Sequence, residues 1–254
     1  MLETHLRKRL EHQEILLMTH IVLGYPSFED CYRIVEAMVA GGVDLMELQI
    51  PFSEPIADGP VILMANQQAL AAGATVARCL EFADRVCREF PIPFLFMSYY
   101  NILFKFGVDA FAAAMADRGV RGAIVPDLPP EEGADYLAAM DRRELAPIFI
   151  YSPNTRPERL ARIATVARGF VYCVARKGVT GADTRFSAHL EDYLRRCRAA
   201  TALPLAVGFG VKDRSDVEFL TGKGDIAVIG TQTIRIIETQ GIGAVTPFIR
   251  GLRP

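Results

Sequence analysis

Two carboxylates lie close together in the sequence, around the end of one apolar run. Glu47 falls near the end of the run Val43–Ile50, and Asp58 lies in the segment that follows, just before a helix-like stretch. Burying a carboxylate without partners is costly, so one at the end of a core strand needs a reason. Two carboxylates that converge from a strand and its loop could supply a proton donor and an electrostatic anchor. The alternatives are a structural salt bridge for Glu47 and a helix cap for Asp58.

Glycine-rich segments in the second half of the chain could bind phosphate. Gly208-Phe209-Gly210 and Gly230-Thr231 follow the last two apolar runs, and Gly230-Thr231 opens a helix-like stretch. Exposed backbone N–H groups and the N-terminus of a helix are suited to an anion. Gly208-Phe209-Gly210 alone could be an ordinary turn, but the two segments together predict a phosphate site. A third segment, 178–181, fits either a flexible surface loop or a closing lid.

These residues must be positioned by strands that alternate with helices. Short apolar runs fall at Ile15–Val22, Val43–Ile50, Phe94–Met97, Ala123–Val125, Pro147–Tyr151, Phe170–Val174, Leu205–Val207 and Ile226–Ile229. Amphipathic segments between them fall at Ser27–Ala40, Thr75–Glu89, Val108–Arg118, Glu131–Arg142, Arg156–Val166, His189–Arg198 and Asp213–Thr221. Eight such alternations in 254 residues predict an α/β fold, a single (β/α)₈ TIM-barrel domain over residues 1–254. In such barrels the chemistry lies at the C-terminal ends of the strands.

Helix ends can also be predicted from residue types. Ser27 and Asp213 are placed as N-caps, and Gly41 and Gly222 as C-terminal stops. An extra helix is expected before the first strand, because leucines recur there at helical spacing, at positions 2, 6 and 10.

Composition excludes several classes of protein. The formal net charge is -2 and no long Lys/Arg block occurs, which argues against a nucleic-acid surface. Five cysteines without a CxxC pair and four scattered histidines give no metal-ligand spacing, so no metal site is predicted. Residues 1–13 lack the apolar core of a signal peptide, and the uncharged run Ile15–Phe28 is too short to span a bilayer. We therefore expect a cytoplasmic protein that does not bind membranes.

With these residues in place, the chain resembles the tryptophan synthase alpha subunit family over essentially its whole length. The matching segments follow the family's order and are Glu47–Pro60, Met97–Asn101, Val125–Pro129, Arg176–Gly181, Gly208–Gly210 and Gly230–Thr231. The resemblance implies a lyase that splits indole-3-glycerol phosphate into indole and glyceraldehyde 3-phosphate by a retro-aldol reaction, without a metal or cofactor in this chain. Glu47 matches the general acid and base, and Asp58 matches the carboxylate that binds the indole N–H.

The resemblance also implies the residues around the substrate. Phe209, Gly210, Gly230 and Thr231 match the phosphate site, with help from Gly181. Tyr172 matches a tyrosine near the substrate, and Thr180 matches a lid threonine that engages the Asp58 side. The indole pocket is matched by His20, Ile62, Met97, Tyr99, Pro126 and Ile150. For the apolar members of this last set, packing in the core is an equal alternative.

A partner is implied as well. Members of the family work in an αββα heterotetramer with a beta subunit, which carries pyridoxal phosphate and receives the indole. The cofactor would therefore belong to the partner chain. Pro51–Pro60 and Tyr99–Asn101 match segments near the partner-facing side.

Some positions depart from the family's usual residues. Gln49 replaces a glycine, Glu54 an aspartate, Thr231 a serine, and His20 a phenylalanine of the indole pocket. A neutral His20 could still stack, whereas a protonated one would disfavour a cationic ring and add pH dependence. Three alternatives therefore stay open beside the coupled enzyme. They are a stand-alone lyase that releases indole, a non-catalytic activator subunit, and another phosphate-binding barrel of the same pathway.

Overall fold

The strands of the chain form a closed parallel barrel. A computed structural model describes residues 1–175, 183–208 and 210–254, and only the backbone of residues 183–188. Eight strands pair in chain order, from β1 to β8, and β8 pairs with β1, which confirms the predicted TIM barrel. The strands are β1 Leu16–Val22, β2 Leu45–Gln49, β3 Phe94–Met97, β4 Gly122–Ile124, β5 Ala146–Tyr151, β6 Val171–Val174, β7 Leu205–Gly208 and β8 Ile226–Ile229.

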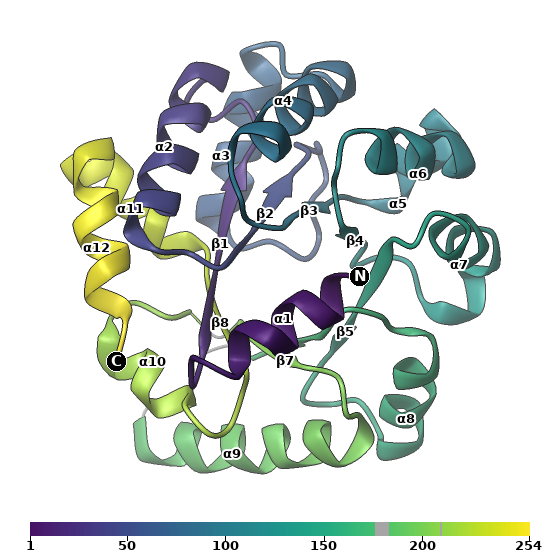
Figure 1. The fold of residues 1–254 in the computed structure, drawn as a ribbon, viewed down its shortest axis with the longest axis vertical. Coiled ribbons are helices and arrows are strands. Elements are labelled where there is room, and N and C mark those ends of the chain that lie inside the picture. The colour runs from purple at the N-terminus through teal and green to yellow at the C-terminus, as the bar shows by residue number, and fades with distance from the viewer. Residues whose placement is uncertain (176–182, 209) are drawn as a thin grey trace.

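Helices other than α1 surround the barrel as an outer ring (Figure 1). The α-helices of the described residues are α1 Leu2–Leu10, α2 Phe28–Gly41, α3 Pro60–Ala71, α4 Val76–Glu89, α5 Tyr100–Phe106, α6 Val108–Asp117, α7 Ala134–Asp141, α8 Pro157–Val166, α9 Asp183–Ala200, α10 Arg214–Leu220, α11 Thr231–Gln240 and α12 Val245–Leu252. Two short 3₁₀ helices, η1 Pro130–Glu132 and η2 Ile242–Ala244, complete the set. In the part of the chain that the structure describes, no helix is both long and apolar enough to cross a bilayer.

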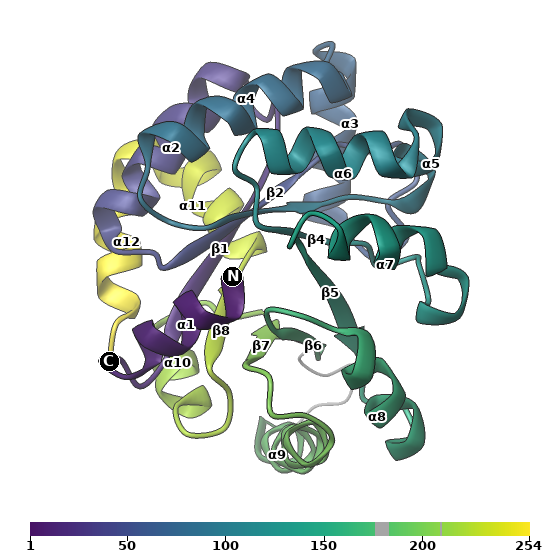
Figure 2. The same ribbon diagram turned by 45° about the vertical axis from the view of Figure 1, so that its right-hand side comes forward.

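The extra N-terminal helix α1 closes one end of the barrel. It lies inside the ring of helices rather than in it (Figure 1 and Figure 2). Its buried Leu2 and Leu6 belong to the same apolar cluster as Ala146, Phe170 and Ile226, which lie at the starts of their strands. The N-terminal end of the barrel is therefore filled with side chains, so a site inside it must open at the other end.

Helix caps follow two of the predicted signals. The side chain of Ser27 accepts a hydrogen bond from the backbone N–H of Asp30 at 3.0 Å. Asp213 accepts one from the backbone N–H of Asp216 at 3.2 Å. These bonds confirm both predicted N-caps, which satisfy donors that a helix leaves unpaired. Gly222 follows the end of α10 with a φ of 77°, as predicted for a C-terminal stop.

The prediction that Gly41 stops its helix is wrong by one residue. α2 runs through Gly41, and Gly42 takes the left-handed conformation with a φ of 93°. Gly41 serves packing instead, because a Cβ there would lie 2.7 Å from Cβ of Ile249 in α12. α12 can approach α2 this closely only because residue 41 has no side chain.

The register of the first two strands determines which side chains meet inside the barrel. On β1, Leu16 and Met18 face the interior, and on β2 Leu45 does the same. Met18 pairs with Leu45, so His20 pairs with Glu47 two residues further along. Because side chains alternate along a strand, His20 and Glu47 point into the barrel one layer above this apolar pair.

A buried carboxylate fastens both ends of the chain to the barrel. Asp44, just before β2, accepts hydrogen bonds from the backbone N–H of Leu17 at 2.8 Å and from Arg9 at 2.5 Å. Arg253, near the C-terminus, donates to the same carboxylate at 2.6 Å. The carboxylate of Asp44 is fully buried, whereas both arginines keep part of their surface in water. We call these four residues the terminal clasp.

We expect Asp44→Asn to lower the free energy of unfolding by about 3 kcal/mol, because breaking a buried ion pair costs about 3–5 kcal/mol and the arginines here retain solvent. Equilibrium urea unfolding followed by circular dichroism would measure it. Asp109→Asn is the control, because Asp109 also binds two arginines but lies on the surface. Equal effects of the two substitutions would contradict the role of burial in the clasp.

Candidate active site

A cavity of about 550 Å³ opens at the C-terminal end of the barrel, which is the size of a small-molecule site. Its walls come from all eight strands or from the segments that follow them. Among the residues predicted from the sequence, it is lined by His20, Glu47, Asp58, Ile62, Met97, Pro126, Ile150, Tyr172, Gly210, Gly230 and Thr231. Thr180, Gly181 and Phe209 were also predicted to bind substrate, and they lie outside the described residues.

Tyr99 is placed differently from its prediction as a pocket residue. It is buried and is not among the residues that line the cavity. Its hydroxyl donates to Oδ2 of Asp58 at 3.3 Å and accepts from the backbone N–H of Ala57 at 3.0 Å. Tyr99 therefore positions the loop that carries Asp58.

Glu47 is held by one specific neighbour. Nδ1 of His20 lies 2.9 Å from Oε1 of Glu47, and both side chains are buried. The other carboxylate oxygen, Oε2, and Nε2 of His20 are buried without a hydrogen-bond partner among the described residues. A buried polar atom without a partner is uncommon and marks a place where a ligand can bind.

The charge state of His20 depends on this neighbour. Burial by itself opposes an imidazolium, but the hydrogen bond and charge of Glu47 outweigh it and raise the pKa of His20 above its ordinary 6.5. Asp58 and the amide of Gln49 act in the same direction. The prediction of His20 as a stacking residue did not include this interaction.

Asp58 is held by a residue of β2 and by a residue that follows β3. The amide of Gln49 donates to Oδ2 of Asp58 at 2.6 Å, beside the bond from Tyr99. Burial raises the pKa of Asp58 above its ordinary 3.8, although Gln49, His20 and Tyr99 oppose the shift. A carboxylate whose charge is costly gains most when a cation comes next to it. Among the described side chains none caps α3, which begins after Gly59, so the helix-cap alternative for Asp58 is not supported.

The segment between β2 and α3 is held in place by a buried asparagine of α3. Asn66 of α3 is fully buried, and its Oδ1 accepts from the backbone N–H of Phe52 at 2.9 Å. The ring of Phe52 stacks on Tyr99 with 5.1 Å between ring centroids. These contacts hold the start of the loop against α3 and Tyr99, which helps to place Asp58 at the cavity.

The side of the cavity at the end of β8 suits an anion. Gly230 precedes α11, which begins at Thr231, so backbone N–H groups of its first turn face this side. Two cationic residues, Lys212 and Arg235, line the same cavity and were not predicted. Their signal is in the sequence, because Lys212 follows Gly210 by two residues and Arg235 lies one helical turn beyond Thr231.

Tyr172, the aromatic residue of β6 that lines the cavity, is neutral. Burial raises the pKa of Tyr172 far above its ordinary 10, so its hydroxyl keeps its proton. A Cβ on Gly208 would lie 2.9 Å from the Tyr172 ring, so only glycine leaves room for the ring there.

No group of His, Cys, Asp and Glu in the described ranges is arranged to hold a metal ion.

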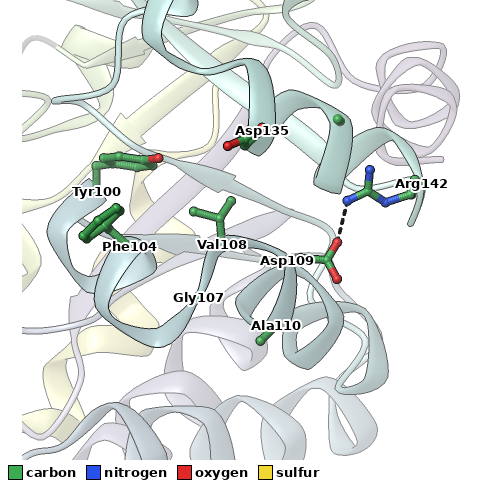
Figure 3. A pocket seen from close by; sticks show the side chains of 9 residues that line it. Tyr100, Phe104, Gly107, Val108, Asp109, Ala110, Asp135 and Arg142 are labelled. Carbon is green, nitrogen blue, oxygen red and sulfur yellow. Dashed lines mark hydrogen bonds and ion pairs between the residues drawn. The ribbon is translucent and has the colours of Figure 1, made fainter.

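A second hollow lies on the outer surface between α5, α6 and α7 (Figure 3). It is lined by Tyr100, Phe104, Val108, Asp109 and Arg142 among others. One of its two acids is already paired, since Arg142 donates to Asp109 at 2.5 Å. The cavity at the barrel mouth, where Oε2 of Glu47 is buried without a partner among the described residues, is the better candidate for chemistry.

Comparisons with known proteins agree on one family. The pattern of the family described as "Tryptophan synthase alpha chain" matches residues 6–246. The chain is 63% identical, over 253 residues and the whole of both chains, to the tryptophan synthase alpha chain of Syntrophotalea carbinolica. It is similar in structure to tryptophan synthase subunit alpha from Legionella pneumophila, with a TM-score of 0.90, 27% identity and coverage of 99% and 96%. A chain of the tryptophan synthase complex from Pyrococcus furiosus gives a TM-score of 0.85 at 28% identity, with coverage of 93% and 97%.

We expect Asn66→Ala to loosen the loop that carries Asp58, because it leaves the Phe52 N–H without its acceptor. Backbone amides of residues 52–58 should exchange with deuterium about tenfold faster, in line with the cost of an unpaired buried donor. Hydrogen exchange with mass spectrometry would measure this, with Gln67→Ala on the exposed face of α3 as the control. Unchanged exchange in Asn66→Ala would show that other contacts hold the loop.

Proposed function

The chain belongs to the tryptophan synthase alpha chain family, lyases of tryptophan biosynthesis, and we propose that it cleaves indole-3-glycerol phosphate into indole and glyceraldehyde 3-phosphate. One observation carries the proposal. Glu47 and Asp58 line one cavity together with the start of α11, which is suited to a phosphate, and apolar side chains close the cavity at the N-terminal end of the barrel. The substrate has the same two parts, an indole ring and a phosphorylated glycerol chain.

In the proposed reaction Glu47 acts first as an acid. It protonates C3 of the indole, which gives a cationic ring. The bond between C3 and the glycerol carbon then breaks, and its electrons return to the ring. As the aldehyde forms, the carboxylate of Glu47 takes the proton of the glycerol hydroxyl. One proton leaves Glu47 and one returns, so the site is regenerated without a cofactor. Such acid–base catalysis is typically worth about 10²–10⁴-fold.

Asp58 stabilises the intermediate in this scheme. Its carboxylate accepts the indole N–H while the ring carries positive charge. Burial raises the pKa of Asp58, so its charge is poorly solvated before the cation forms. The attraction between the two charges therefore appears only as the ring becomes cationic, which favours the intermediate over the bound substrate.

The phosphate would bind at the start of α11. The backbone N–H groups after Gly230 and the positive end of the α11 dipole supply the part of the phosphate site that needs no charged side chain. Lys212 and Arg235 would add positive charge at its rim. This arrangement holds the substrate by the end that does not react, which orients the indole toward the two carboxylates.

We further propose that the chain works with a beta subunit in an αββα complex. Two exposed apolar side chains support a docking face, Ile56 in the loop that carries Asp58 and Phe104 on α5, whose exposed fractions are 79% and 69%. Phe104 lies beside Tyr100 at the hollow of Figure 3. Exposed apolar side chains on segments that follow β2 and β3 fit a partner that receives indole. Pyridoxal phosphate would be held by that partner.

We expect Glu47→Gln to lower indole release by about 10²–10⁴-fold, because the amide can neither give nor take the proton. The measurement is steady-state indole formation from indole-3-glycerol phosphate, with substrate binding followed by calorimetry. Glu36→Gln, on the exposed face of α2, is the matched control. Wild-type turnover in Glu47→Gln would refute the acid–base role.

We expect indole release to rise strongly when a beta subunit is added, and Phe104→Asp to weaken that activation. The concentration of beta subunit for half activation should rise about tenfold or more, as for an aromatic residue near the centre of an interface. Leu70→Asp, an exposed apolar residue on α3, is the control. Fast release that ignores the partner would favour the stand-alone lyase, and no release in either case would favour the non-catalytic subunit.

A further inference from the structure

We propose that His20 is a positioning residue for Glu47, sharing one transferable proton with it and leaving Oε2 of the carboxylate free for the substrate. The inference rests on the proposed lyase reaction and names a second member of its proton-transfer group. It concerns a residue that the family resemblance places only in the packing around the indole.

The pairing of β1 with β2 by itself places His20 and Glu47 beside each other. His20 and Glu47 are directly opposed in the parallel register of β1 and β2. Both face the barrel interior, and their exposed fractions are 3% and 4%. The distance of 2.9 Å between Nδ1 and Oε1 therefore joins two side chains that have little room to separate.

The hydrogen bond makes the two oxygens of Glu47 different. Oε1 is occupied by the imidazole, whereas Oε2 is buried and has no partner in the part of the chain that the structure describes. Glu47 lines the cavity, so Oε2 is the atom that can reach a bound substrate. A carboxylate fixed through one oxygen loses less freedom when the other oxygen transfers a proton.

The pair can hold its protons in two arrangements of equal charge. In one, an imidazolium faces a carboxylate. In the other, a neutral imidazole with its proton on Nδ1 faces a carboxyl group protonated on Oε2. Nδ1–H donates to Oε1 in both, so the geometry of the pair does not change. The arrangements differ in whether the remaining proton is on Nε2 or on Oε2, and it passes between these atoms by way of water in the cavity, because the direct hydrogen bond joins the other two atoms. The second arrangement is the acid of the proposed reaction.

Proton transfer then balances without a further group. Oε2 gives its proton to C3 of the indole, and the resulting carboxylate keeps the Nδ1–H bond from His20. As the carbon–carbon bond breaks, Oε2 takes the proton of the glycerol hydroxyl. The pair is neutral before and after, which avoids an isolated charge in a buried site.

Other groups around the pair also favour the protonated form of His20. Asp58, on the loop after β2, and the amide of Gln49 stabilise a charged His20. Tyr172, from β6, stays neutral and adds no charge. On the β8 side a Cβ on Gly230 would lie 3.7 Å from Cβ of His20, and the cationic residues Lys212 and Arg235 line the same cavity. Removal of the Glu47 carboxylate should leave burial as the main influence on the imidazole.

The first test is a direct titration of His20 by NMR of the full chain. Only four histidines are present, so His20→Asn assigns the signal. The wild-type midpoint should lie above 6.5, and in Glu47→Gln it should fall by at least about one unit because desolvation then dominates. The same midpoint in both proteins would overturn the proposal.

The second test is the pH dependence of indole release in His20→Asn. Asparagine can still donate to Oε1 but cannot hold the proton, so Glu47 must retain it unaided. An ordinary carboxyl group loses its proton at lower pH than an imidazolium, so the high-pH limb of kcat/KM should move down by about one unit or more. At pH 8 this lowers kcat about tenfold, while KM should change less than twofold.

The control is His12→Asn, which changes an exposed histidine near the N-terminus. It should keep the wild-type pH profile. A wild-type profile in His20→Asn would overturn the proposal even if the NMR titration shows the pair. Absence of indole release from the wild-type chain, alone and with a beta subunit, would instead refute the proposed function, whatever pKa the NMR titration gives for His20.

Discussion

Burial of a carboxylate inside the barrel is the constraint on which the site depends. Glu47 lies in an interior that is otherwise filled by apolar side chains, where an unpaired charge is costly. His20 on β1 and Gln49 on β2 each bond to one of the two site carboxylates. His20 bonds to Glu47, and Gln49 bonds to Asp58. The polar layer is thus supported from within the barrel wall, and the apolar layer below it, sealed by α1, keeps water out from that end.

The fold was largely predictable because its signals are local. Each strand is a short apolar run, and capping residues such as Ser27 mark helix starts within three residues. Two helices were not predicted, for reasons of distance along the chain. The backbone N–H of Tyr100 at the start of α5 is satisfied by Asp127, 27 residues away. α12 contains Pro247 and Gly251, and its packing on Gly41 outweighs its weak helix propensity.

The site was predictable as a set of residues but not as a set of interactions. Glu47, Asp58 and Gly230 could be selected because chemistry at strand ends needs such types. His20 and Gln49 could be noticed only as departures from a family pattern. Their partners depend on the register between β1 and β2, which no single segment contains. Tyr99 illustrates the converse, since its position suggested the pocket, while its hydroxyl supports the loop behind it.

The terminal clasp has a consequence for the order in which the protein is made. Arg253 donates to the carboxylate of Asp44, which also binds the backbone of β1. During synthesis the clasp can therefore form only after Arg253 has left the ribosome. β8 is equally needed to pair with β1. The barrel closes late in synthesis, and nascent chains expose the edge of β1 until then.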